Sequence, residues 1–330
     1  MPKRILIAGA GGFIGGHLVG KLLSDGNEVM AVDNKSLDRW YQRHQRAENR
    51  VLNLEERQAC FHAAEGCQEI YNLACNMGGM GFIENNRALC MLSVLINTHL
   101  LMAAKDHGIE KYFYASSACV YPDYRQQESA VTALKESDAY PAMPENGYGW
   151  EKLFSERMCR HFQEDFDLEV RIARLHNVYG PWGTWDGGRE KAPAAICRKV
   201  LESKDSGHDE LIIWGDGEQT RSFMYINDCL EGIARLMNSA HSEPINLGRS
   251  ELVTINRLVD LVEEVAGIRV ERRYQLDAPQ GVRGRNSDNQ EILSVLGWQP
   301  EIDLRSGIDP TYIWIEEQFQ RRKNGASIVL

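Results

Sequence analysis

The sequence predicts an α/β fold in which a doubly wound parallel sheet carries helices on both faces and a smaller mixed domain follows. Three observations favour this class. Short apolar runs alternate with segments of helical periodicity, a glycine-rich turn follows the first run, and the character of the sequence changes near residue 178. A chain of 330 residues, 43% of them hydrophobic, can bury a core of this size.

The expected strands are short apolar runs, as in a sheet that is buried on both faces. The first, RILIAG (4–9), ends in glycines. The next segment, FIGGHLVGKLLSDG, has apolar residues at helical spacing and is expected to end at Gly26. The pattern of the first strand recurs and predicts four further strands of the sheet, at 28–33, 69–74, 111–116 and 168–175.

Two expected helices carry more apolar surface than one buried face requires. Residues 85–107 are apolar around most of the helix circumference, and a second helix begins near Tyr148. A surface helix shows a polar face, so the first must be covered on a second side. One interpretation is a homodimer in which these helices build a four-helix bundle. The other, equally open, is burial of the helix within its own subunit.

The glycine-rich turn GAGGFIG lies directly between the first strand and the first helix. Gly9, Gly12 and Gly15 have a spacing that permits a tight turn and a close approach of the backbone to a pyrophosphate at the helix N-terminus. Asp33 ends the second strand, where a carboxylate accepts hydrogen bonds from a ribose diol and repels a 2′-phosphate. The alternative is a glycine turn without a ligand. The context predicts a Rossmann-type site that prefers NAD to NADP, with Lys35 nearby.

The texture of the sequence changes after about residue 178, where GPWGTWDGGREKAP is glycine-rich, aromatic and charged. LIIWGDG and RSFMYINDC follow, and PINLG is again typical of a strand of the main sheet. We therefore expect an NAD-binding Rossmann domain over 1–177 plus about 226–250. The smaller substrate-binding domain is expected over about 178–225 plus 251–330.

Composition narrows the class of partners. A net charge of −10 argues against nucleic acid, while a local cluster of Arg and Lys could still bind an anionic small ligand. No run approaches the roughly 18 apolar residues needed to span a bilayer, and the strand-like N-terminus gives no sign of a secretory signal. The eight cysteines are scattered without a metal-type spacing. We therefore expect reduced thiols, no metal and a cytoplasmic enzyme.

YGWEK places Tyr148 and Lys152 four residues apart on one helical face. A phenol is a poor base at neutral pH because its ordinary pKa is about 10. A lysine ammonium and a nicotinamide cation would both stabilise the phenolate and lower that pKa. Ser117, at the end of a strand, could hydrogen-bond the same substrate hydroxyl. Their coincidence with the glycine turn predicts a site that oxidises a hydroxyl group.

These features together resemble the extended short-chain dehydrogenase/reductase superfamily, whose members process nucleotide sugars with bound NAD. The resemblance covers essentially the whole chain and rests on GAGGFIG, SS-x-x-V-Y, YxxxK, RLHNVYGP, RSFMYINDC and LGWQP. Within it, YASSACVYP, MGGMGFI (77–83) and GTWDGGREKAPAAICRK (183–199) look very like the GDP-mannose 3,5-epimerases. EGVRGRNSDN is also that family's form, with Gln280 here in place of its glutamate.

The resemblance implies an isomerase that converts GDP-mannose to GDP-L-galactose, and to GDP-L-gulose by inversion at carbon 5 alone. Oxidation of carbon 4 by bound NAD, with Tyr148, Lys152 and Ser117, would make the hydrogens at carbons 3 and 5 acidic. Cys119 would then be the base and Lys191 the opposing ammonium. The alternative for Cys119 is a packed core cysteine.

The resemblance also implies the residues that bind each ligand. Guanidinium groups match phosphate geometry, so Arg283 and Arg221 are the expected diphosphate ligands, and sequence alone does not separate Arg285 from Arg283. His176 is expected to be structural. The implied NAD-binding residues are Gly9, Gly12, Phe13, Ile14, Gly15, Asp33, Asn53, Ala74, Tyr148 and Lys152. The implied substrate-binding residues are Gly78, Ser117, Cys119, Asn177, Glu190, Lys191, Ala192, Lys199, Gln219, Arg221 and Arg283.

Besides Gln280, three residues depart from the pattern of the resembling family. Asn53 stands where the family has an acidic residue near the adenine; its carbonyl can accept a hydrogen bond, but it carries no charge. Cys75 and Asn76 stand where the family more often has Ala and Asp. Among rival functions, an epimerase acting at carbon 4 needs no Cys/Lys pair, and a 4,6-dehydratase needs an acidic pair where this chain has Ala118 and Cys119. A non-catalytic NAD-binding scaffold needs none of these residues.

Overall fold

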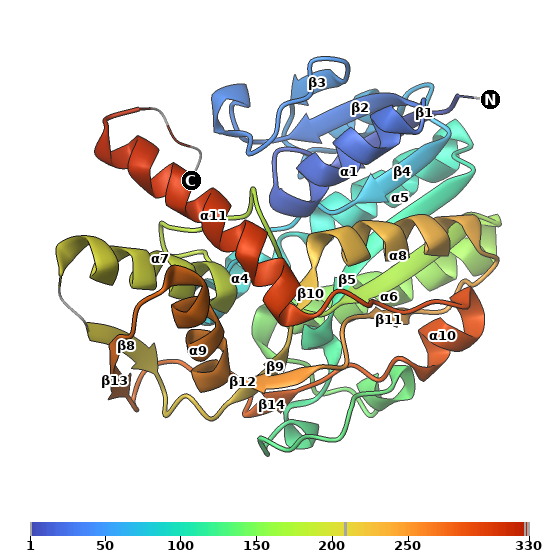
Figure 1. Ribbon diagram of the computed structural model, residues 1–330. Coiled ribbons are helices and arrows are strands. Elements are labelled where there is room, and N and C mark those ends of the chain that lie inside the picture. Colours follow the sequence, from blue (N-terminus) through green and yellow to red (C-terminus); the bar gives the residue numbers. More distant parts are fainter. Residues whose placement is uncertain (1, 208–209, 327, 329–330) are drawn as a thin grey trace.

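The computed structural model describes residues 2–207, 210–326 and 328, and its centre is a sheet of seven parallel strands (Figure 1). The chain builds from β1 out to β3 and then returns to β4 on the other side of β1, so the strand order reverses there. Ligands of such sheets bind beyond the carboxyl ends of the strands at this reversal. In spatial order the strands are β11 (Ile245–Leu247), β6 (Glu169–Leu175), β5 (Lys111–Ser117), β4 (Glu69–Asn72), β1 (Arg4–Ala8), β2 (Glu28–Asp33) and β3 (Glu48–Val51).

The predicted strands of the sheet are confirmed, including the one expected in PINLG, which pairs with β6. Their apolar runs are continuous because both faces of the sheet are covered. In β1, Ile5 and Ile7 belong to one hydrophobic cluster, and Leu6 and Ala8 belong to another on the opposite face.

Two layers of helices enclose the sheet. On one face, α1 (Phe13–Ser24) packs against α8 (Ile226–Asn238). On the other, α5 (Val94–His107) packs against α2 (Arg57–Ala64) and α6 (Asn146–Phe166). The end predicted for α1 is confirmed: Gly26 lies two residues beyond the helix in the left-handed region, at φ 86°.

The prediction of one helix over 85–107 is wrong. The chain forms α3 (Met80–Asn85) and α4 (Arg87–Met91) before α5, and Asn86, at φ −130° and ψ 41°, interrupts the helical path. By length and mean hydropathy alone, 1.5 in its most apolar window, Arg87–His107 would suffice to cross a bilayer, contrary to expectation. However, 44% of that window is buried inside the chain, where α5 covers the sheet.

Most of the remaining elements lie to the left and at the bottom of Figure 1, and α10 lies at the lower right. They form three small sheets, in the orders β10-β7, β12-β9-β14 and β13-β8, with helices between them. Because β11 and α8 lie with the central sheet, the chain crosses back to it once; the division into two domains stays a prediction. These elements are β7 (Val178–Tyr179), α7 (Ala192–Ser206), β8 (Glu210–Trp214), β9 (Thr220–Ser222), β10 (Met224–Tyr225), β12 (Leu252–Thr254), α9 (Ile255–Ala266), β13 (Glu271–Gln275), β14 (Gly284–Arg285), α10 (Gln290–Leu296) and α11 (Leu304–Lys323).

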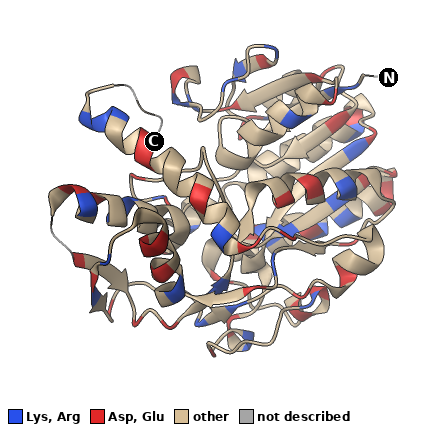
Figure 2. Cartoon of the chain, in the orientation of Figure 1, with Lys and Arg blue, Asp and Glu red and all other residues tan. Residues whose placement is uncertain are grey.

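Acidic and basic residues alternate over most elements of the fold (Figure 2). A smaller group of charged residues is buried, and several members of that group lie beyond the carboxyl ends of the strands or at the start of α6. Glu145, Glu151, Lys152 and Arg285 each have an exposed fraction of 5% or less. Buried charges need partners, so their contacts show what this end of the sheet is built to hold.

Candidate active site

The glycine turn at the end of β1 forms a cradle open to a ligand. Gly9 has φ 86°, and Gly12 precedes α1 without any side chain capping the helix. A Cβ on Gly15 would lie 2.1 Å from the carbonyl oxygen of Gly9, so only glycine allows α1 to begin this close to the turn. The amide groups of the first turn, which include Phe13 and Ile14, therefore face outward as an anion site.

Asp33 ends β2 beside this turn. Its Oδ2 accepts a hydrogen bond from the Gly11 amide at 3.0 Å, and its Oδ1 accepts one from the Lys35 amide at 3.0 Å. The Lys35 ammonium donates to the Gly11 carbonyl at 3.2 Å, and burial lowers its pKa. Lys35 thus braces the turn, and the carboxylate is oriented where a ribose diol would lie next to the cradle.

The other two residues assigned to the adenine side lie in loops after strands. Ala74 follows β4 and packs on the turn, since a Cβ on Gly9 would lie 3.0 Å from the Ala74 nitrogen. Asn53 follows β3, is exposed, and accepts a hydrogen bond from the Glu55 amide at 3.2 Å. Its carboxamide is thus engaged locally in this structure. The cradle, Asp33 and Ala74 together fit a dinucleotide.

Tyr148, Lys152 and Ser117 come together as the sequence predicts. Ser117 ends β5 and lies near Tyr148 on α6, where its hydroxyl acts to lower the pKa of the phenol. The Lys152 ammonium lies 5.6 Å from the centroid of the Tyr148 ring. Contrary to expectation, the pKa of Tyr148 is well above its ordinary value, because burial dominates and the neighbouring thiols and Glu151 add to it. The nicotinamide cation has to supply part of the opposing effect.

The pKa of Lys152 is raised. Burial by itself would lower it, but Cys75 and Glu151 more than offset burial. The Glu151 carboxylate lies 3.6 Å from the ammonium, and its other oxygen accepts from Tyr114 and Ser155 at 3.1 and 2.9 Å. Lys152 is therefore held in its charged form beneath Tyr148.

Cys119 lies on a short 3₁₀ turn, Ala118–Val120, immediately after β5. Its amide donates to the Ser117 hydroxyl at 3.2 Å, and its Sγ accepts from Arg285 Nη1 at 3.6 Å. Burial raises the pKa of the thiol, with Glu145 acting in the same direction, while Arg285, Ser117 and Lys191 oppose the shift. Cys119 also packs against Tyr148, so the thiol adjoins the oxidation site.

Lys191 immediately precedes α7, and Ala192 is the first residue of that helix. Burial lowers the pKa of Lys191, while the nearby thiols Cys119 and Cys75 act to raise it. The thiol and the amine assigned to proton transfer therefore lie in one pocket. Glu190 accepts a hydrogen bond from Arg198 at 3.1 Å, which fixes the segment that leads into the helix.

Two loops close over this pocket. A Cβ on Gly78 would lie 2.8 Å from the side chain of Phe82, and the Gly79 amide donates to the Arg189 carbonyl at 3.1 Å. The Arg189 guanidinium stacks over the Phe82 ring at 3.8 Å. Loop 77–79 therefore lies against the segment that carries Glu190 and Lys191.

Cys75 is a residue whose position sequence reasoning did not resolve. It lies in the loop after β4, close to Tyr148 and Lys152, and burial raises the pKa of its thiol while these two residues act to lower it. Asn76 follows it, and its amide donates to Ser93 Oγ at 2.9 Å. The pocket therefore contains a second thiol.

The residues assigned to the diphosphate lie farther along the same face. Arg221 on β9 donates only to two backbone carbonyls, at 2.8 and 3.0 Å, and no carboxylate among the described residues pairs with it. Burial and the neighbouring Arg285 lower its pKa to about 10. Gln219 has a buried carbonyl oxygen without a hydrogen-bond partner in the described part of the chain. Arg221 is therefore suited to bind an anionic ligand, and the Gln219 oxygen can accept a hydrogen bond from a donor on that ligand.

Lys199 and Asn177 flank Arg221 and Gln219. The Lys199 ammonium donates to the Ile212 carbonyl at 2.8 Å, and burial lowers its pKa. Asn177, at φ 37°, donates from Nδ2 to the Ser222 carbonyl at 3.0 Å. Adjacent to Asn177, the buried His176 donates to Asn246 at 3.0 Å, which agrees with a structural role.

The structure separates Arg283 from Arg285. Arg283 forms a two-point ion pair with Asp216 at 2.7 and 2.9 Å near the surface. Arg285 is buried and contacts Gln126, Cys119 and Glu145. Of the two, Arg285 is the one in the pocket with Tyr148 and Lys191. The sequence carries no signal for this choice, because both arginines lie two residues apart in the same segment, GVRGR.

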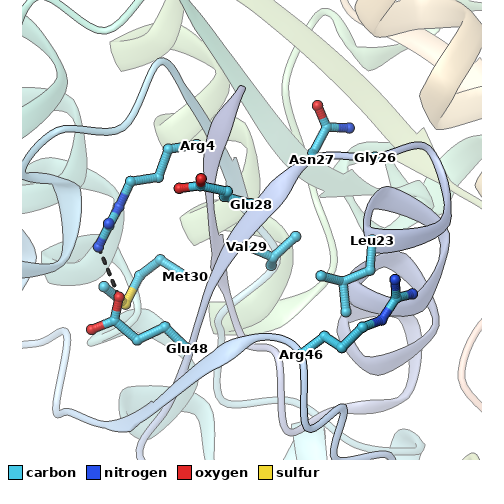
Figure 3. Close-up of a pocket in the computed structure, with 9 residues that line it drawn as sticks. All are labelled: Arg4, Leu23, Gly26, Asn27, Glu28, Val29, Met30, Arg46 and Glu48. Carbon is cyan, nitrogen blue, oxygen red and sulfur yellow. Dashed lines mark hydrogen bonds and ion pairs between the residues drawn. The ribbon is translucent and has the colours of Figure 1, made fainter. Parts of the chain in front are cut away.

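A surface cavity elsewhere does not contain these groups. It lies at the amino ends of β1 and β2 and is lined by residues such as Arg4, Glu28, Arg46 and Glu48 (Figure 3). Arg4 and Glu48 pair with each other at 2.8 Å across it. The cavity lies at the amino ends of the strands and the cradle at their carboxyl ends, so the cavity has no part in the site.

Comparison with known proteins agrees with this geometry. The model of the "NAD dependent epimerase/dehydratase family" matches residues 5–248. The chain belongs to the NAD-dependent epimerase/dehydratase family. It uses NAD, for which the cradle and Asp33 are the expected site. The relatives described next show that it is an isomerase.

Within this family, the chain is 44% identical over 327 residues to the GDP-mannose 3,5-epimerase of Arabidopsis thaliana, covering 99% of this chain and 85% of the relative. It is also 44% identical to GDP-mannose 3,5-epimerase 1 of Oryza sativa subsp. japonica, over 97% of this chain and 83% of the relative. The resemblance predicted from the motifs is confirmed.

Solved structures of the family have the same fold. The UDP-glucose 4-epimerase of Thermotoga maritima superposes with a TM-score of 0.87 at 24% identity, covering 96% of this chain and 99% of that one. The Thermus thermophilus UDP-glucose 4-epimerase complex with NAD gives 0.82 at 22% identity, over 94% and 98%. At these identities the likeness shows the fold and leaves the substrate open.

Proposed function

We propose that this chain epimerises GDP-mannose at carbons 3 and 5 to give GDP-L-galactose, and GDP-L-gulose when only carbon 5 inverts. The single observation that supports the proposal most is that Cys119 shares a buried cluster with Tyr148 and that Cys119 and Lys191 lie near enough for each to shift the pKa of the other. An epimerase acting at carbon 4 has no use for this pair. The 44% identity to plant enzymes of that activity supports the same substrate.

NAD, when bound in the cradle, supplies reversible oxidation at carbon 4. Tyr148 removes the proton of the carbon 4 hydroxyl, and Ser117, which lies near the phenol, holds the sugar oxygen. The charged Lys152 beneath stabilises the phenolate that results. The same groups return the proton in the final reduction, so the reaction has no net redox change.

The carbon 4 ketone makes the hydrogens at carbons 3 and 5 acidic. In the proposed mechanism Cys119 removes a proton from one face of the sugar, and Lys191 delivers one to the other. The cations Arg285 and Lys191 favour the thiolate, whereas burial opposes it. Because the pKa of the resting thiol is raised, bound substrate has to complete its activation.

The GDP moiety is proposed to lie along Gln219, Arg221 and Lys199, beyond the sugar pocket. Arg221 has no carboxylate partner among the residues described. The diphosphate of the substrate would supply the missing negative charge. Arg283 remains a proposed ligand of the diphosphate if its ion pair with Asp216 opens.

The proposed assembly is a homodimer through α4, α5 and α6. Met91 and Leu92 near α4 are 48% and 47% exposed, and Trp150 and Phe154 on α6 are 44% and 56% exposed. α4 packs on α6, so these side chains form one apolar face. The cytoplasm is the proposed compartment, since all eight cysteines are free thiols.

The proposal is tested by incubating the protein with GDP-mannose in deuterated water and locating the label. We expect deuterium at carbons 3 and 5 with the native chain, and at neither with Cys119→Ala. Cys75→Ala is the matched control, because it removes the other thiol that adjoins Tyr148.

Label retained in Cys119→Ala but lost in Cys75→Ala would move the base to Cys75. Inversion at carbon 4 without label at carbons 3 or 5 would identify a carbon 4 epimerase instead. NAD binding without any turnover of nucleotide sugars would favour the non-catalytic scaffold.

A further inference from the structure

Glu145 is a buried carboxylate that the proposed chemistry does not use. It immediately precedes α6, its exposed fraction is 3%, and no side chain caps the helix there. Its Oε1 accepts a hydrogen bond from Arg285 Nη2. Its Oε2 is also buried and has no hydrogen-bond partner among the residues that the structure describes. An anion in this position is costly unless nearby positive charge offsets it.

Arg285 joins Glu145 to the thiol of Cys119. Each nitrogen of its guanidinium has a separate partner: Nε donates to Gln126 at 2.6 Å, Nη2 to Glu145, and Nη1 to Cys119 Sγ at 3.6 Å. Because the guanidinium is planar, fixing two nitrogens sets the direction of the third. Glu145 and Gln126 therefore aim Nη1 at the sulfur.

The backbone holds Glu145 in register with Cys119 as well. The Glu145 amide donates to the Cys119 carbonyl at 3.1 Å, and the Gly149 amide donates to the Glu145 carbonyl at 2.8 Å. A Cβ on Gly149 would lie 2.2 Å from the Cys119 carbonyl oxygen, so the start of α6 is packed directly on the thiol's own residue. Neither residue can move without the other.

We propose that Glu145 is a positioning residue for Cys119: it fixes Arg285 against the sulfur and cancels its charge, so that the resting cysteine stays a thiol. The proposal rests on the proposed function, in which Cys119 exchanges protons with the sugar. Without the carboxylate, an uncompensated guanidinium would stand beside the sulfur and favour the thiolate. Glu145 thus restricts the base to the enzyme with substrate bound.

The charges around the sulfur agree with this role. Glu145 raises the pKa of Cys119 second only to burial, and Arg285, Ser117 and Lys191 lower it. Arg285 in turn is kept charged, since Glu145 and Cys119 outweigh its burial. The titratable and charged groups that face Cys119 are Glu145 and Tyr148 from α6, Arg285 from β14, Lys191 before α7, Cys75 after β4, Cys90 from α4 and Arg221 from β9.

The test is a pH titration followed by the ultraviolet absorbance of the thiolate. For each protein the curve of its Cys119→Ser counterpart is subtracted, so that the absorbance of the other seven thiols cancels. In Glu145→Gln, which keeps the shape and the acceptor for Arg285, we expect the Cys119 midpoint to fall and the thiolate fraction at neutral pH to rise on the order of tenfold. The acid limb of deuterium exchange should move to lower pH in parallel. Asp123→Asn is the matched control, because this exposed carboxylate lies near the same pair without contacting Cys119.

An unchanged Cys119 midpoint in Glu145→Gln, or an equal shift in Asp123→Asn, would overturn the proposal. Should Glu145→Gln fail to fold, the native protein decides: a midpoint below that of an ordinary thiol shows that Arg285 is not compensated. The titration needs no turnover, so the proposed function can fail the deuterium test while Glu145 passes this one, and the reverse.

Discussion

At the scale of single residues, the candidate site combines side chains that the sequence motifs predict with neighbouring side chains that the motifs do not predict. Tyr148, Lys152, Ser117, Cys119 and Lys191 meet where the motifs predict. The roles of Arg285 and Cys75 follow only from contacts, because their positions in the chain are far from Cys119 and Tyr148. Glu145 was missed altogether; a carboxylate one turn before Tyr148 was the available signal.

Tyr148→Phe is expected to reduce epimerisation by about 10²- to 10⁴-fold, because it removes the group that takes the carbon 4 proton. NAD binding should survive, because the phenylalanine ring can occupy the place of the tyrosine ring in the cluster with Cys119. Steady-state rates and bound NAD are the measurements. Tyr124→Phe, on an exposed tyrosine, is the control. Full activity in Tyr148→Phe would assign the proton transfer to another group.

Gly15→Ala is expected to lower the free energy of unfolding by about 1–3 kcal/mol and to reduce NAD content, because its Cβ would lie 2.1 Å from the Gly9 carbonyl oxygen. Urea unfolding and the cofactor content of purified protein measure the two effects. Gly16→Ala is the matched control, since its Cβ would lie 3.1 Å from Gln42 Cβ and 3.5 Å from the nearest backbone atom, the Ala10 carbonyl oxygen. Equal NAD content in both variants would speak against the cradle.

At the scale of elements, the broken helix over 85–107 shows how packing overrides a continuous apolar pattern. α4 approaches α6 so closely that a Cβ on Gly147 would lie 2.4 Å from the Arg87 carbonyl oxygen. The apolar pattern predicted correctly that α5 is widely buried. It did not predict that Asn86 interrupts the helix at the start of the 85–107 segment. Periodicity records which residues are apolar, and the close approach of two backbones decides where a helix stops.

Phe154→Glu is expected to convert a dimer to monomers, because it places a charge in the apolar face formed with Trp150, Met91 and Leu92. Sedimentation velocity at several concentrations measures the change. Ile313→Glu on α11 is the matched control, as Ile313 is 53% exposed but lies on another element. A native chain that sediments as a monomer would refute the proposed interface.

At the scale of the whole molecule, His176 joins the central sheet to the segments that complete the site. It follows β6, its amide donates to the Leu247 carbonyl at 3.0 Å, and its ring donates to Asn246 at 3.0 Å. A Cβ on Gly248 would lie 2.6 Å from the Cβ of His176. The stability of this junction therefore bears on the entire fold.

Burial lowers the pKa of His176 to about 3, whereas the unfolded chain has the ordinary value of about 6.5. Between these pH values the unfolded state binds the extra proton, so the free energy of unfolding falls as pH falls, by up to about 1.4 kcal/mol per pH unit. Urea unfolding from pH 7 downward should show a shallower dependence in His176→Gln than in the native chain. His62→Gln, at an exposed site, is the control.

By itself, the sequence predicted the class of fold and the glycine cradle, and it singled out the five side chains of the proposed reaction. These features depend on local spacing: a glycine turn between strand and helix, and a tyrosine and a lysine on one helical face. Only the tertiary structure decided that Arg285 rather than Arg283 reaches Cys119, that Cys75 adds a second thiol, and that Glu145 balances the charge. Those choices depend on burial and on contacts between residues distant in the chain, which no local pattern encodes.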